Sequence, residues 1–432
     1  MLRIAIVGAG PSGASAGVHL ARMGHDVLLF DRAAFPRDKP CGDWLTPLAL
    51  DEIRAIGLGV AALRARAASS ALISSTSLRA PSGRTSRVAM TLAPLSPSRW
   101  NALGAVSALS ADTHEAHPTA PMLEGHHGGG LCIPRARLDA VLVEQAVASG
   151  CELRRQAFTT VTPGAPGLEG FDLVVDARGS AAGPVNAVGL RGYWTLPRSA
   201  LGEDSPLDAD FARQAHEVSI RTTARHRRGY GWVFPTDVRD DRVTFNLGVG
   251  LWKADIKPGD GPREMLARFL AADPLAGMLE RLAVERSHPQ GFPLAMGGWS
   301  TPRVGSGRWA RIGDAAALAD PLTGDGIGNA LLSGRLLAQA VAEARPEPRS
   351  GTTGAPATGG RAPCPDPGDA WQTLFEAKLR PELRRAWLLR QALVPVAAKN
   401  GAAWLLDRAP QTVRQKLHQA LFGALTYREA LF

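Results

Sequence analysis

The sequence predicts an α/β fold with an α+β second domain and a helical C-terminal region. Three observations support this fold class. Residues 3–31 alternate strand, helix and strand, residues 217–252 follow a β-like pattern, and residues from 371 onwards are nearly all helical in pattern. Because the β-rich stretch is followed by a further strand and helix of the first type, the two domains are expected to interleave along the chain.

The first 31 residues predict a β-α-β unit. Arg3 to Val7 is expected to be a buried strand, Gly8 to Gly13 a turn, Ala14 to Met23 a helix that ends at Gly24, and Asp26 to Phe30 a second strand. A unit of this length that turns on glycines is typical of a Rossmann-type dinucleotide-binding domain.

The turn Gly8-Ala9-Gly10-Pro11-Ser12-Gly13 has the GxGxxG spacing in its expected context, between a strand and a helix. Gly8 permits the tight turn, Gly10 lets the backbone approach a diphosphate, and Gly13 lets helix and strand pack closely. The helix N-terminus then presents free N–H groups to the diphosphate, and Asp31 can accept hydrogen bonds from the adenosine ribose. The predicted cofactor-binding residues here are Gly8, Gly10, Pro11, Ser12, Gly13, Asp31, Arg32 and Arg37.

A second motif, about 300 residues later, identifies the dinucleotide. The strand at Arg311-Ile312-Gly313 ends in Gly313-Asp314 and is followed by the glycine-rich run Asp320 to Gly328, which opens a helix from Gly326 to Arg345. This resembles the second flavin motif of glutathione-reductase-type FAD enzymes. The resemblance implies that FAD is bound and that Asp314 contacts its ribityl or diphosphate region. It also implies flavin contacts from Gly324, Gly326, Ile327 and Gly328.

The remaining pattern divides the chain into seven consecutive segments. We expect a helix at Leu138–Ser149, a strand at Asp172–Asp176 and a hairpin with its loop at Thr236 to Arg242. The C-terminal helices are expected to break at Pro381, Pro395 and Pro410. The predicted segments are a first FAD-binding segment (1–68), an irregular insertion that starts the substrate domain (69–130), a second FAD-binding segment (131–190), a β-sheet substrate domain (191–300), a third FAD-binding segment (301–345), a flexible loop (346–368) and a helical basic region (369–432).

Composition restricts the partners and the compartment. The net charge of +9 comes from scattered Lys and Arg without a dense basic run, so nucleic acid is not expected. Residues 371–432 carry ten Lys and Arg against four Asp and Glu, which predicts peripheral contact with an anionic membrane. Four cysteines without CxxC spacing favour a reducing cytoplasm. We expect no transmembrane span, because no uncharged apolar run reaches about 18 residues. We also expect no secretory signal, because glycines interrupt the first apolar run.

No metal site is predicted. The polar residues His114, Glu115, His117, His126 and His127 lie in a Gly-, Pro- and Ala-rich stretch without the regular ligand spacing of zinc sites. A solvated loop is the simpler interpretation of this stretch.

The segment between the two motifs carries a family resemblance. Phe35-Pro36-Arg37-Asp38-Lys39-Pro40-Cys41-Gly42 resembles the Pro-x-x-x-x-Cys-Gly segment of the geranylgeranyl reductase family. Members are FAD enzymes with a p-hydroxybenzoate-hydroxylase-like fold, and they include bacterial reductases of menaquinone isoprenyl tails. Further matches are Pro134-Arg135 with Leu138-Asp139, the run Tyr230-Gly231-Trp232-Val233-Phe234-Pro235, and Gly248-Val249-Gly250.

The resemblance implies hydride transfer from reduced flavin to isolated C=C bonds of a polyprenyl or other lipophilic substrate. It places Cys41 and Gly42 against the isoalloxazine and Arg135 on the cofactor. An unactivated alkene accepts hydride only if a proton reaches the neighbouring carbon, and the Cys41 thiol, with an ordinary pKa of about 8.5, is a candidate donor. The predicted catalytic residues are Cys41, Tyr230 and Trp232, and the predicted pocket residues are Trp44, Tyr230, Trp232, Phe234 and Pro321.

Packing roles remain open for these residues. Cys41 also fits a small buried packing position, and alternating Tyr230, Trp232 and Phe234 also fit the buried face of a strand. Two departures concern the substrate. Trp44 stands where family members often have a small residue, and the twelve residues from Thr236 to Leu247 are more than the family usually has before its Gly-x-Gly.

Other flavin chemistries are alternatives. Arg178 stands where NADPH-dependent aromatic hydroxylases carry an Asp, which argues against a phenol hydroxylase. The Tyr-x-Trp-x-Phe-Pro run is similar to the Trp-x-Trp-x-Ile-Pro of flavin-dependent halogenases. A monooxygenase or epoxidase acting through a C4a-hydroperoxyflavin, a halogenase and a redox-neutral enzyme therefore stay open. No second GxGxxG opens a helix, so we expect electrons from transiently bound NAD(P)H or a reduced protein partner.

Overall fold

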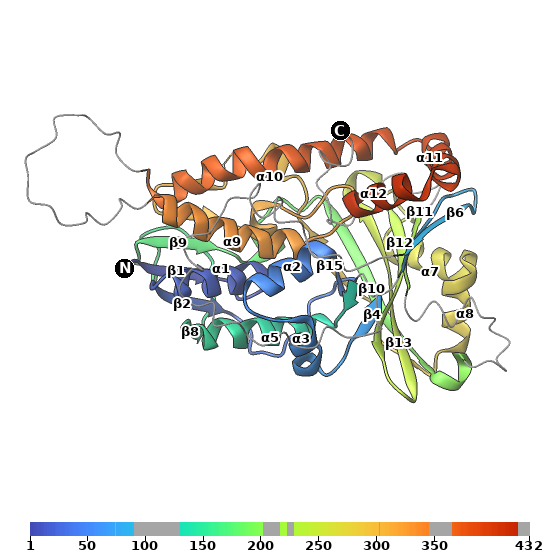
Figure 1. The fold of residues 1–432 in the computed structure, drawn as a ribbon, viewed down its shortest axis with the longest axis horizontal. Helices are drawn as coiled ribbons and strands as arrows, with labels where there is room; N and C mark the ends of the chain where they lie inside the picture. Colours follow the sequence, from blue (N-terminus) through green and yellow to red (C-terminus); the bar gives the residue numbers. More distant parts are fainter. Residues whose placement is uncertain are drawn as a thin grey trace, which may run out of the picture.

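The computed structural model describes residues 1–73, 75–89, 130–201, 217–222, 229–301, 303–344 and 365–421. Figure 1 shows two sheets at opposite ends of the molecule, with helices stacked on the first and a long helix running along one side of both. Short 3-10 helices lie at Gly179–Ala181, Arg198–Leu201, Lys253–Asp255, Gly298–Ser300 and Gly313–Ala316.

The first sheet is mostly parallel and has six strands: β1 (Arg3–Val7), β2 (Asp26–Asp31), β8 (Glu152–Arg155), β9 (Leu173–Asp176), β16 (Gly305–Ser306) and β17 (Trp309–Arg311). Their order is β16-β17-β9-β1-β2-β8, and only β16 runs antiparallel to its neighbour. The central strands β1 and β9 are short apolar runs because both of their faces are covered. Ligands bind open sheets of this type at the carboxyl ends of the strands, where Gly8, Asp31 and Asp314 follow.

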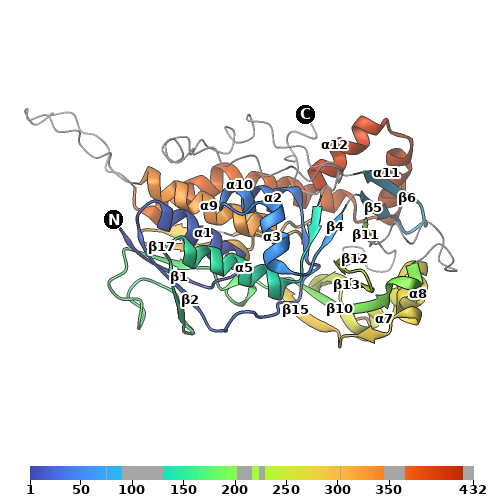
Figure 2. The same cartoon turned by 60° about the horizontal axis from the view of Figure 1, so that its bottom comes forward.

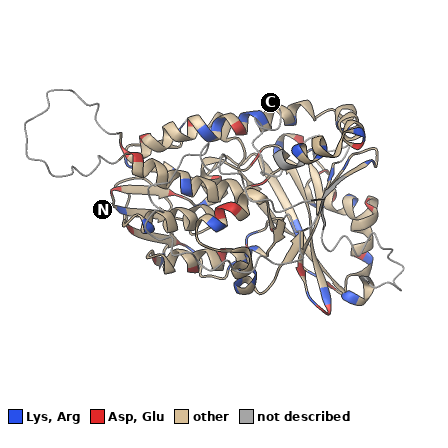
Figure 3. Ribbon diagram, in the orientation of Figure 1, with Lys and Arg blue, Asp and Glu red and all other residues tan. Residues whose placement is uncertain are grey.

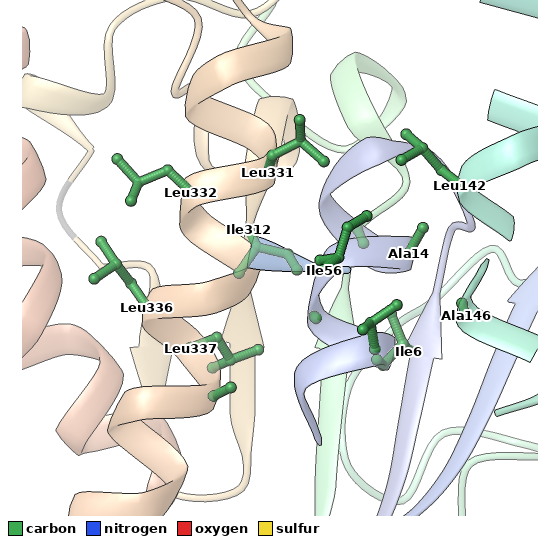
Figure 4. Close-up of a cluster of buried hydrophobic side chains, with 14 of the residues drawn as sticks. Ile6, Ala14, Ile56, Leu142, Ala146, Ile312, Leu331, Leu332, Leu336 and Leu337 are labelled. Carbon is green, nitrogen blue, oxygen red and sulfur yellow. The ribbon is translucent and has the colours of Figure 1, made fainter. Parts of the chain in front are cut away.

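Five helices share a hydrophobic core with this sheet: α1 (Pro11–Arg22), α2 (Pro47–Ala55), α3 (Val60–Ala67), α5 (Arg135–Ala148) and α9 (Ile327–Glu343). Helix α1 lies between α9 and α5. Figure 4 shows this core, with Leu331 of α9 on one side of Ala14 and Leu142 of α5 on the other. Gly334 lets the two helix backbones approach, because a Cβ there would lie 2.6 Å from the amide nitrogen of Ala16.

The second sheet has eight strands: β5 (Ser75–Arg79), β6 (Thr85–Ala89), β10 (Ala187–Pro197), β11 (Glu217–Thr222), β12 (Tyr230–Val238), β13 (Arg242–Trp252), β14 (Glu285–Arg286) and β15 (Gln290–Leu294). Helices α7 (Pro262–Ala272) and α8 (Pro274–Leu282) cover one face, where Val233, Phe245 and Leu247 are buried. Because side chains alternate along a strand, Trp232 and Asn246 point to the opposite face. That face is turned toward the first sheet.

A small third sheet joins β3 (Trp44–Leu45), β7 (Gly130–Cys132) and β4 (Ala71–Ile73). Three helices end the described chain: α10 (Pro367–Ala392), α11 (Val396–Arg408) and α12 (Gln411–Leu421). Helix α10 packs against α9, and α11 lies beside β6 at the far end of the second sheet (Figure 2). The C-terminal helices therefore connect the two sheets.

Three expectations about local structure were wrong. Residues 71–89 form β4, β5 and β6 instead of an irregular insertion, and the serine- and threonine-rich β5 becomes a strand by pairing with β11. The hairpin loop spans only 239–241, because Asp237 and Val238 continue the pairing past a β-bulge. Pro381 lies inside α10, where the flanking buried Leu379 and Leu383 hold the helix despite the missing N–H. The stretches 90–129, 345–364 and 422–432 lie outside the described residues.

Candidate active site: a cavity between the two sheets

A cavity of about 700 Å³ runs between the carboxyl edge of the first sheet and the open face of the second. Both predicted flavin motifs and the aromatic strand line it. The predicted residues in its wall are Gly8, Gly10, Pro11, Ser12, Asp31, Arg32, Arg37, Cys41, Gly42, Trp44, Arg135, Tyr230, Trp232, Phe234, Asp314, Pro321, Gly324, Gly326 and Ile327. The two remaining predicted residues, Gly13 and Gly328, lie outside the cavity lining. Gly13 packs against Gly8, and Gly328 packs against Leu48 and Asp325.

The first end of the cavity is the glycine-rich turn. Gly8 has φ +111, and a Cβ on Gly13 would overlap the carbonyl oxygen of Gly8, so both positions require glycine. Buried Asp31 accepts hydrogen bonds from the amides of Ala9 and Ala33, both at 2.9 Å. These bonds fix its carboxylate at the end of β2, where a ribose would be bound.

Arg37 closes this end of the cavity. Its guanidinium lies 3.0 Å from Asp139 and 3.7 Å from Asp31, and it also lies over the ring of Phe35. Arg135 is buried and makes a bidentate pair with Asp139, with distances of 2.7 and 2.8 Å. Three predicted elements, the end of β2, the Pro-x-x-x-x-Cys-Gly segment and the Pro-Arg segment, are thus joined by shared carboxylates.

The middle of the cavity is the Gly-Asp turn and the N-terminus of α9. Lys39 Nζ lies 3.1 Å from Asp314 Oδ2 and over the ring of Phe292. The hydroxyl of Tyr230 donates a hydrogen bond to the carbonyl of Thr323, and Gly324, with φ +74, leaves room for it. Asp325 accepts a 2.8 Å hydrogen bond from the Thr46 hydroxyl, and desolvation raises its pKa to about 6.

This arrangement fits FAD. The N-termini of α1 and α9 both face the cavity, and the glycines at their N-cap positions, Gly10 and Gly326, offer no side chain to the helix amides. At α9 the Asp325 carboxyl already accepts a hydrogen bond from the Gly328 amide at 3.3 Å. Two such N-termini are suited to negative charge, one at the diphosphate and one at the pyrimidine edge of a flavin. Gly10 leaves the backbone bare on the cavity side, since the nearest atom to a Cβ there would be Arg37 Nη2 at 3.5 Å.

Cys41 is half-buried in the cavity wall. Burial raises the pKa of its thiol, and the charge of Arg135 opposes this effect. The thiol is therefore neutral near pH 7 and holds a proton at Sγ. Next to it, Gly42 packs against the Phe234 ring, which a Cβ at this position would meet at 2.9 Å.

The second end of the cavity is aromatic. Trp44, Trp232 and Phe234 belong to one buried cluster with Ile220, and the ring centroids of Trp44 and Phe234 are 5.7 Å apart. Tyr230 and Trp232 follow at 6.0 Å. Alternation along β12 puts these side chains on the same face. The apolar wall continues over Leu251, Trp252, Phe292, Leu294, Met296 and Leu322.

Several functional candidates were missed from the sequence. Lys39, Asp43, Arg191, Tyr193 and Asn246 meet around the cavity from segments up to 207 residues apart, and each contacts another charged or polar group. Only Asp43 and Lys39 had a local signal, because they flank Cys41 and Gly42 in the recognised segment. The other three lie on strands whose pairing the pattern does not specify.

Arg178 is engaged with its own strand end. It makes a bidentate ion pair with Asp176 and donates to the carbonyls of Phe158 and Thr159. Among the described residues there is no group of three His, Cys, Asp or Glu that could hold a metal, and the histidines of residues 114–127 lie outside them. Within the same described part of the chain, no helix is long and apolar enough to cross a membrane.

Fold and site together define an FAD-dependent oxidoreductase, and the comparisons with known proteins agree. A family model described as an FAD binding domain matches residues 1–164. A menaquinone reductase of Mycobacterium tuberculosis is 32% identical over 354 residues, which cover 78% of this chain and 75% of that protein. The chain belongs to the geranylgeranyl reductase family of FAD-dependent oxidoreductases, so the resemblance found in the sequence is confirmed.

Solved structures share the fold. A geranylgeranyl bacteriochlorophyll reductase-like protein from Thermoplasma acidophilum superposes with a TM-score of 0.66 at 16% identity, over 100% of this chain and 97% of that one. A flavin-dependent brominase superposes with a TM-score of 0.63 at 18% identity, over 99% and 95%. At these identities the likeness concerns the fold alone.

Proposed function

We propose that this enzyme reduces C=C bonds of an isoprenoid or other lipophilic substrate with hydride from reduced FAD. The observation that carries the proposal is the shared cavity, which joins a dinucleotide cradle to an aromatic and aliphatic compartment without a wall between them. A relative named menaquinone reductase and a fold neighbour named geranylgeranyl bacteriochlorophyll reductase-like support a prenylated lipid as the substrate class.

In this proposal FAD, when reduced, supplies the hydride, and the chain binds, orients and protonates. The amides of the α1 N-terminus bind the diphosphate, Asp31 binds the ribose, and the Lys39–Asp314 pair holds the ribityl region. The N-terminus of α9 favours negative charge on the flavin ring. Trp232 and Phe234 exclude water from the compartment in which the alkene lies.

Two groups in the wall can hold the proton that an unactivated alkene needs. The Cys41 thiol stays neutral because burial raises its pKa. The Asp325 carboxyl, with a pKa near 6, is partly protonated close to neutral pH. Tyr230 is a poorer candidate, because its hydroxyl proton is already donated to Thr323.

The test is an anaerobic single turnover. Photoreduced enzyme is mixed with a menaquinone that bears a geranylgeranyl tail, and the flavin absorbance and the lipid mass are followed. We expect flavin reoxidation together with a gain of about two mass units in the lipid, the mass of the added hydride and proton. Flavin that stays reduced across a panel of prenyl lipids would reject this function. A Cys41→Ala variant that still reoxidises flavin at the full rate would move the proton donor to Asp325.

Oxygen distinguishes the alternative class. A monooxygenase or epoxidase, or a halogenase, would form an absorbing C4a-hydroperoxyflavin when the reduced enzyme is rapidly mixed with oxygen. We expect direct return to oxidised flavin instead. An intermediate that forms and decays before the oxidised spectrum returns would favour the oxygen-using chemistries.

For the electron donor we propose transiently bound NAD(P)H or a reduced protein partner, because the sequence has no second GxGxxG that opens a helix. Stopped-flow reduction by NADH and by NADPH, compared with reduced ferredoxin, separates these sources. If neither NADH nor NADPH reduces the flavin, a reduced protein partner is the remaining electron donor.

We propose that the C-terminal helices contact an anionic membrane surface. Leu388, Trp404, Leu405 and Val413 of α10, α11 and α12 are exposed large hydrophobic side chains. Figure 3 shows basic residues at several positions on α10 and α12. Exposed apolar groups among basic residues are typical of interfacial helices. The end of α12 also packs against the aromatic cluster around Trp232, through Leu421.

A further inference from the structure

The Asp43 carboxylate is a buried junction between the two sheets. Asp43 follows Gly42 and is fully buried. Its own φ is +65, a left-handed conformation that Asp tolerates better than most residues. Its Oδ1 accepts a hydrogen bond from the Arg135 amide at 3.2 Å, at the start of α5. Its Oδ2 accepts from Tyr193 at 2.6 Å, Asn246 at 2.9 Å and Thr236 at 3.3 Å. One carboxylate from the cofactor side therefore binds three strands of the second sheet.

Asn246 hydrogen-bonds to both Asp43 and Trp232 and so links the two residues. Its Nδ2 donates to Asp43 and, at 2.6 Å, to the carbonyl of Cys41, while its Oδ1 accepts from the Trp232 indole N–H at 2.9 Å. The Asp43 carboxylate and the Cys41 carbonyl, which face Asn246 Nδ2, can only accept hydrogen bonds, and the Trp232 indole N–H, which faces Oδ1, can only donate one. The amide therefore has one possible orientation. Neither a carboxylate nor an apolar side chain of the same size can satisfy both sides at once.

Three glycines form the surface on which the Trp232 indole lies, and we call this surface the glycine floor. Gly189 of β10 and Gly248 and Gly250 of β13 all lie beneath the indole, and the Gly-x-Gly element thus has a steric function. A glycine floor supplies no side chains to hold the ring in register. The hydrogen bond that the indole N–H donates to Asn246 Oδ1 is the directional contact that selects one position of the ring over this flat surface.

We propose that Asp43 and Asn246 are positioning residues that fix the Trp232 indole and the Cys41 backbone together, and thereby set the shape of the substrate compartment. Asp43 orients the Asn246 amide, and Asn246 then holds the ring on one side and the Cys41 carbonyl on the other. The inference about the ring position does not depend on the proposed function, whereas its effect on substrate does.

The first test is a double-mutant cycle with Asn246→Leu and Trp232→Phe. Each enzyme is titrated in its oxidised FAD form with a menaquinone bearing a geranylgeranyl tail, and binding is read from the perturbation of the flavin spectrum. We expect Asn246→Leu to weaken binding about five- to tenfold, the effect of one buried hydrogen bond. The same change should have a clearly smaller effect in the Trp232→Phe background, because Phe has no N–H to hold and only the contacts with the Cys41 carbonyl and Asp43 remain to be lost. Equal effects in both backgrounds would overturn the proposal.

A crystal structure of Asn246→Leu with FAD bound provides a readout without substrate. We expect the Trp232 indole to leave the position it has over Gly248, and an unmoved ring would overturn the proposal. If the wild-type enzyme does not bind the menaquinone at all, this menaquinone is excluded as the substrate, but the ring position still decides the inference.

A second variant covers the case in which Asn246→Leu does not fold. Asn246→Asp puts a second carboxyl against Asp43, and the pair can hold together only by sharing a proton. The other titratable and charged groups near Asp43 are Arg191 and Tyr193 of β10, Arg135 of α5, and the thiols of Cys41 and Cys132. We expect menaquinone binding by this variant, relative to wild type at the same pH, to weaken at least about fivefold as pH rises from about 5 to about 9, since the titration of Asp325 in the same wall is common to both proteins. A ratio of the two affinities that stays constant with pH would contradict the proposal.

The matched control is Glu280→Ala. Trp194 lies on the opposite face of the same sheet and donates its indole N–H to Glu280 of α8 at 2.5 Å. Removal of this bond breaks an equivalent indole contact away from the cavity. We expect unchanged menaquinone binding and an unchanged position of Trp232, and a loss equal to that of Asn246→Leu would reduce the effect to general destabilisation of the sheet.

Discussion

The indole of Trp232 lies directly over Gly248, and a Cβ on Gly248 would overlap the Cζ2 atom of that ring. A Cβ there would also lie 2.6 Å from the carbonyl oxygen of Leu190, so Gly248→Ala is expected to push the indole into the substrate compartment and to strain the pairing of β10 with β13. Overpacking of this kind costs about 1–3 kcal/mol, so we expect weaker menaquinone binding with flavin content unchanged. Flavin absorbance per mole of protein and a lipid titration measure the two effects separately.

Gly250→Ala is the control for this prediction. It lies two residues further along the same strand, where a Cβ would meet Trp232 at an ordinary contact distance of 3.8 Å. We expect near wild-type lipid binding. Equal losses in the two variants would mean that the floor under Trp232 does not decide the binding.

Alanine substitutions at Gly10 and Gly13 of the N-terminal turn are expected to have different effects. A Cβ on Gly13 would overlap the backbone of Gly8, whereas a Cβ on Gly10 would meet only Arg37, at 3.5 Å. Gly13→Ala should therefore yield little folded protein. Gly10→Ala should fold but retain less FAD, because its Cβ occupies the space left for the diphosphate. Circular dichroism and flavin content of the purified proteins distinguish these outcomes, and full flavin occupancy in Gly10→Ala would contradict the assigned diphosphate position.

The ion pair of Glu52 in α2 and Arg335 in α9 is predicted to matter for stability. Both side chains are buried, and both hydrogen bonds measure 2.7 Å. Glu52→Leu leaves the guanidinium without its carboxylate partner and should lower the free energy of unfolding by about 3–5 kcal/mol. The double change Glu52→Leu with Arg335→Met should recover much of this loss. Glu144→Ala, which breaks the exposed pair with Arg66, should cost less than about 1 kcal/mol in the same denaturant titration.

Asp325 is expected to make stability depend on pH. Desolvation raises its pKa in the folded protein to about 6, above the ordinary value of 3.8. The folded state therefore holds this proton more tightly than the unfolded state, and the resulting stability is complete below about pH 4 and lost as pH rises through about 6. At about 1.4 kcal/mol per pKa unit, the loss is at most about 3 kcal/mol, and less in a hydrated cavity.

Asp325→Asn tests this linkage. The amide has no charge to desolvate, so the variant should gain stability relative to wild type above about pH 6 and show no gain near pH 4. Denaturant midpoints of both proteins over this pH range give the difference directly. A difference that stays constant with pH would show that Asp325 does not titrate in this range.

Vesicle binding is predicted to depend on the exposed apolar residues of α11. Trp404 is 46% exposed and Leu405 is 62% exposed. The double variant Trp404→Ser with Leu405→Ser should reduce cosedimentation with anionic vesicles severalfold. The control is Leu282→Ser with Val284→Ser, where the exposed fractions are 37% and 67% but the residues lie at and beyond the end of α8. If both double variants bind vesicles as well as wild type does, the exposed apolar residues of α11 do not contact the membrane.

The sequence predicted the elements whose signals are local. The turn from Gly8 to Gly13 and the Gly313–Asp314 turn were both found, because each combines glycines, a strand end and a helix start within a few residues. The alternation of Tyr230, Trp232 and Phe234 likewise predicted a shared face. Their common cavity follows from the fold, and their individual roles in the reaction stay predictions.

The junction around Asp43 could not be predicted in the same way. Tyr193, Thr236 and Asn246 lie on three strands, and their meeting point depends on the register of β10, β12 and β13 and on a loop about 150 to 200 residues away. No local pattern encodes such a register. Residues 75–79 were misjudged for a related reason, because a polar strand pairs through its backbone with a partner about 140 residues later.

The order of strands in the first sheet has a consequence for biosynthesis. Strand β17 pairs with β9 only after more than 300 residues have been synthesised, and α9, which forms part of the cofactor cavity, follows it. A nascent chain on the ribosome can form the early β-α-β unit but cannot enclose a flavin. We therefore expect cofactor loading to follow translation of the second sheet.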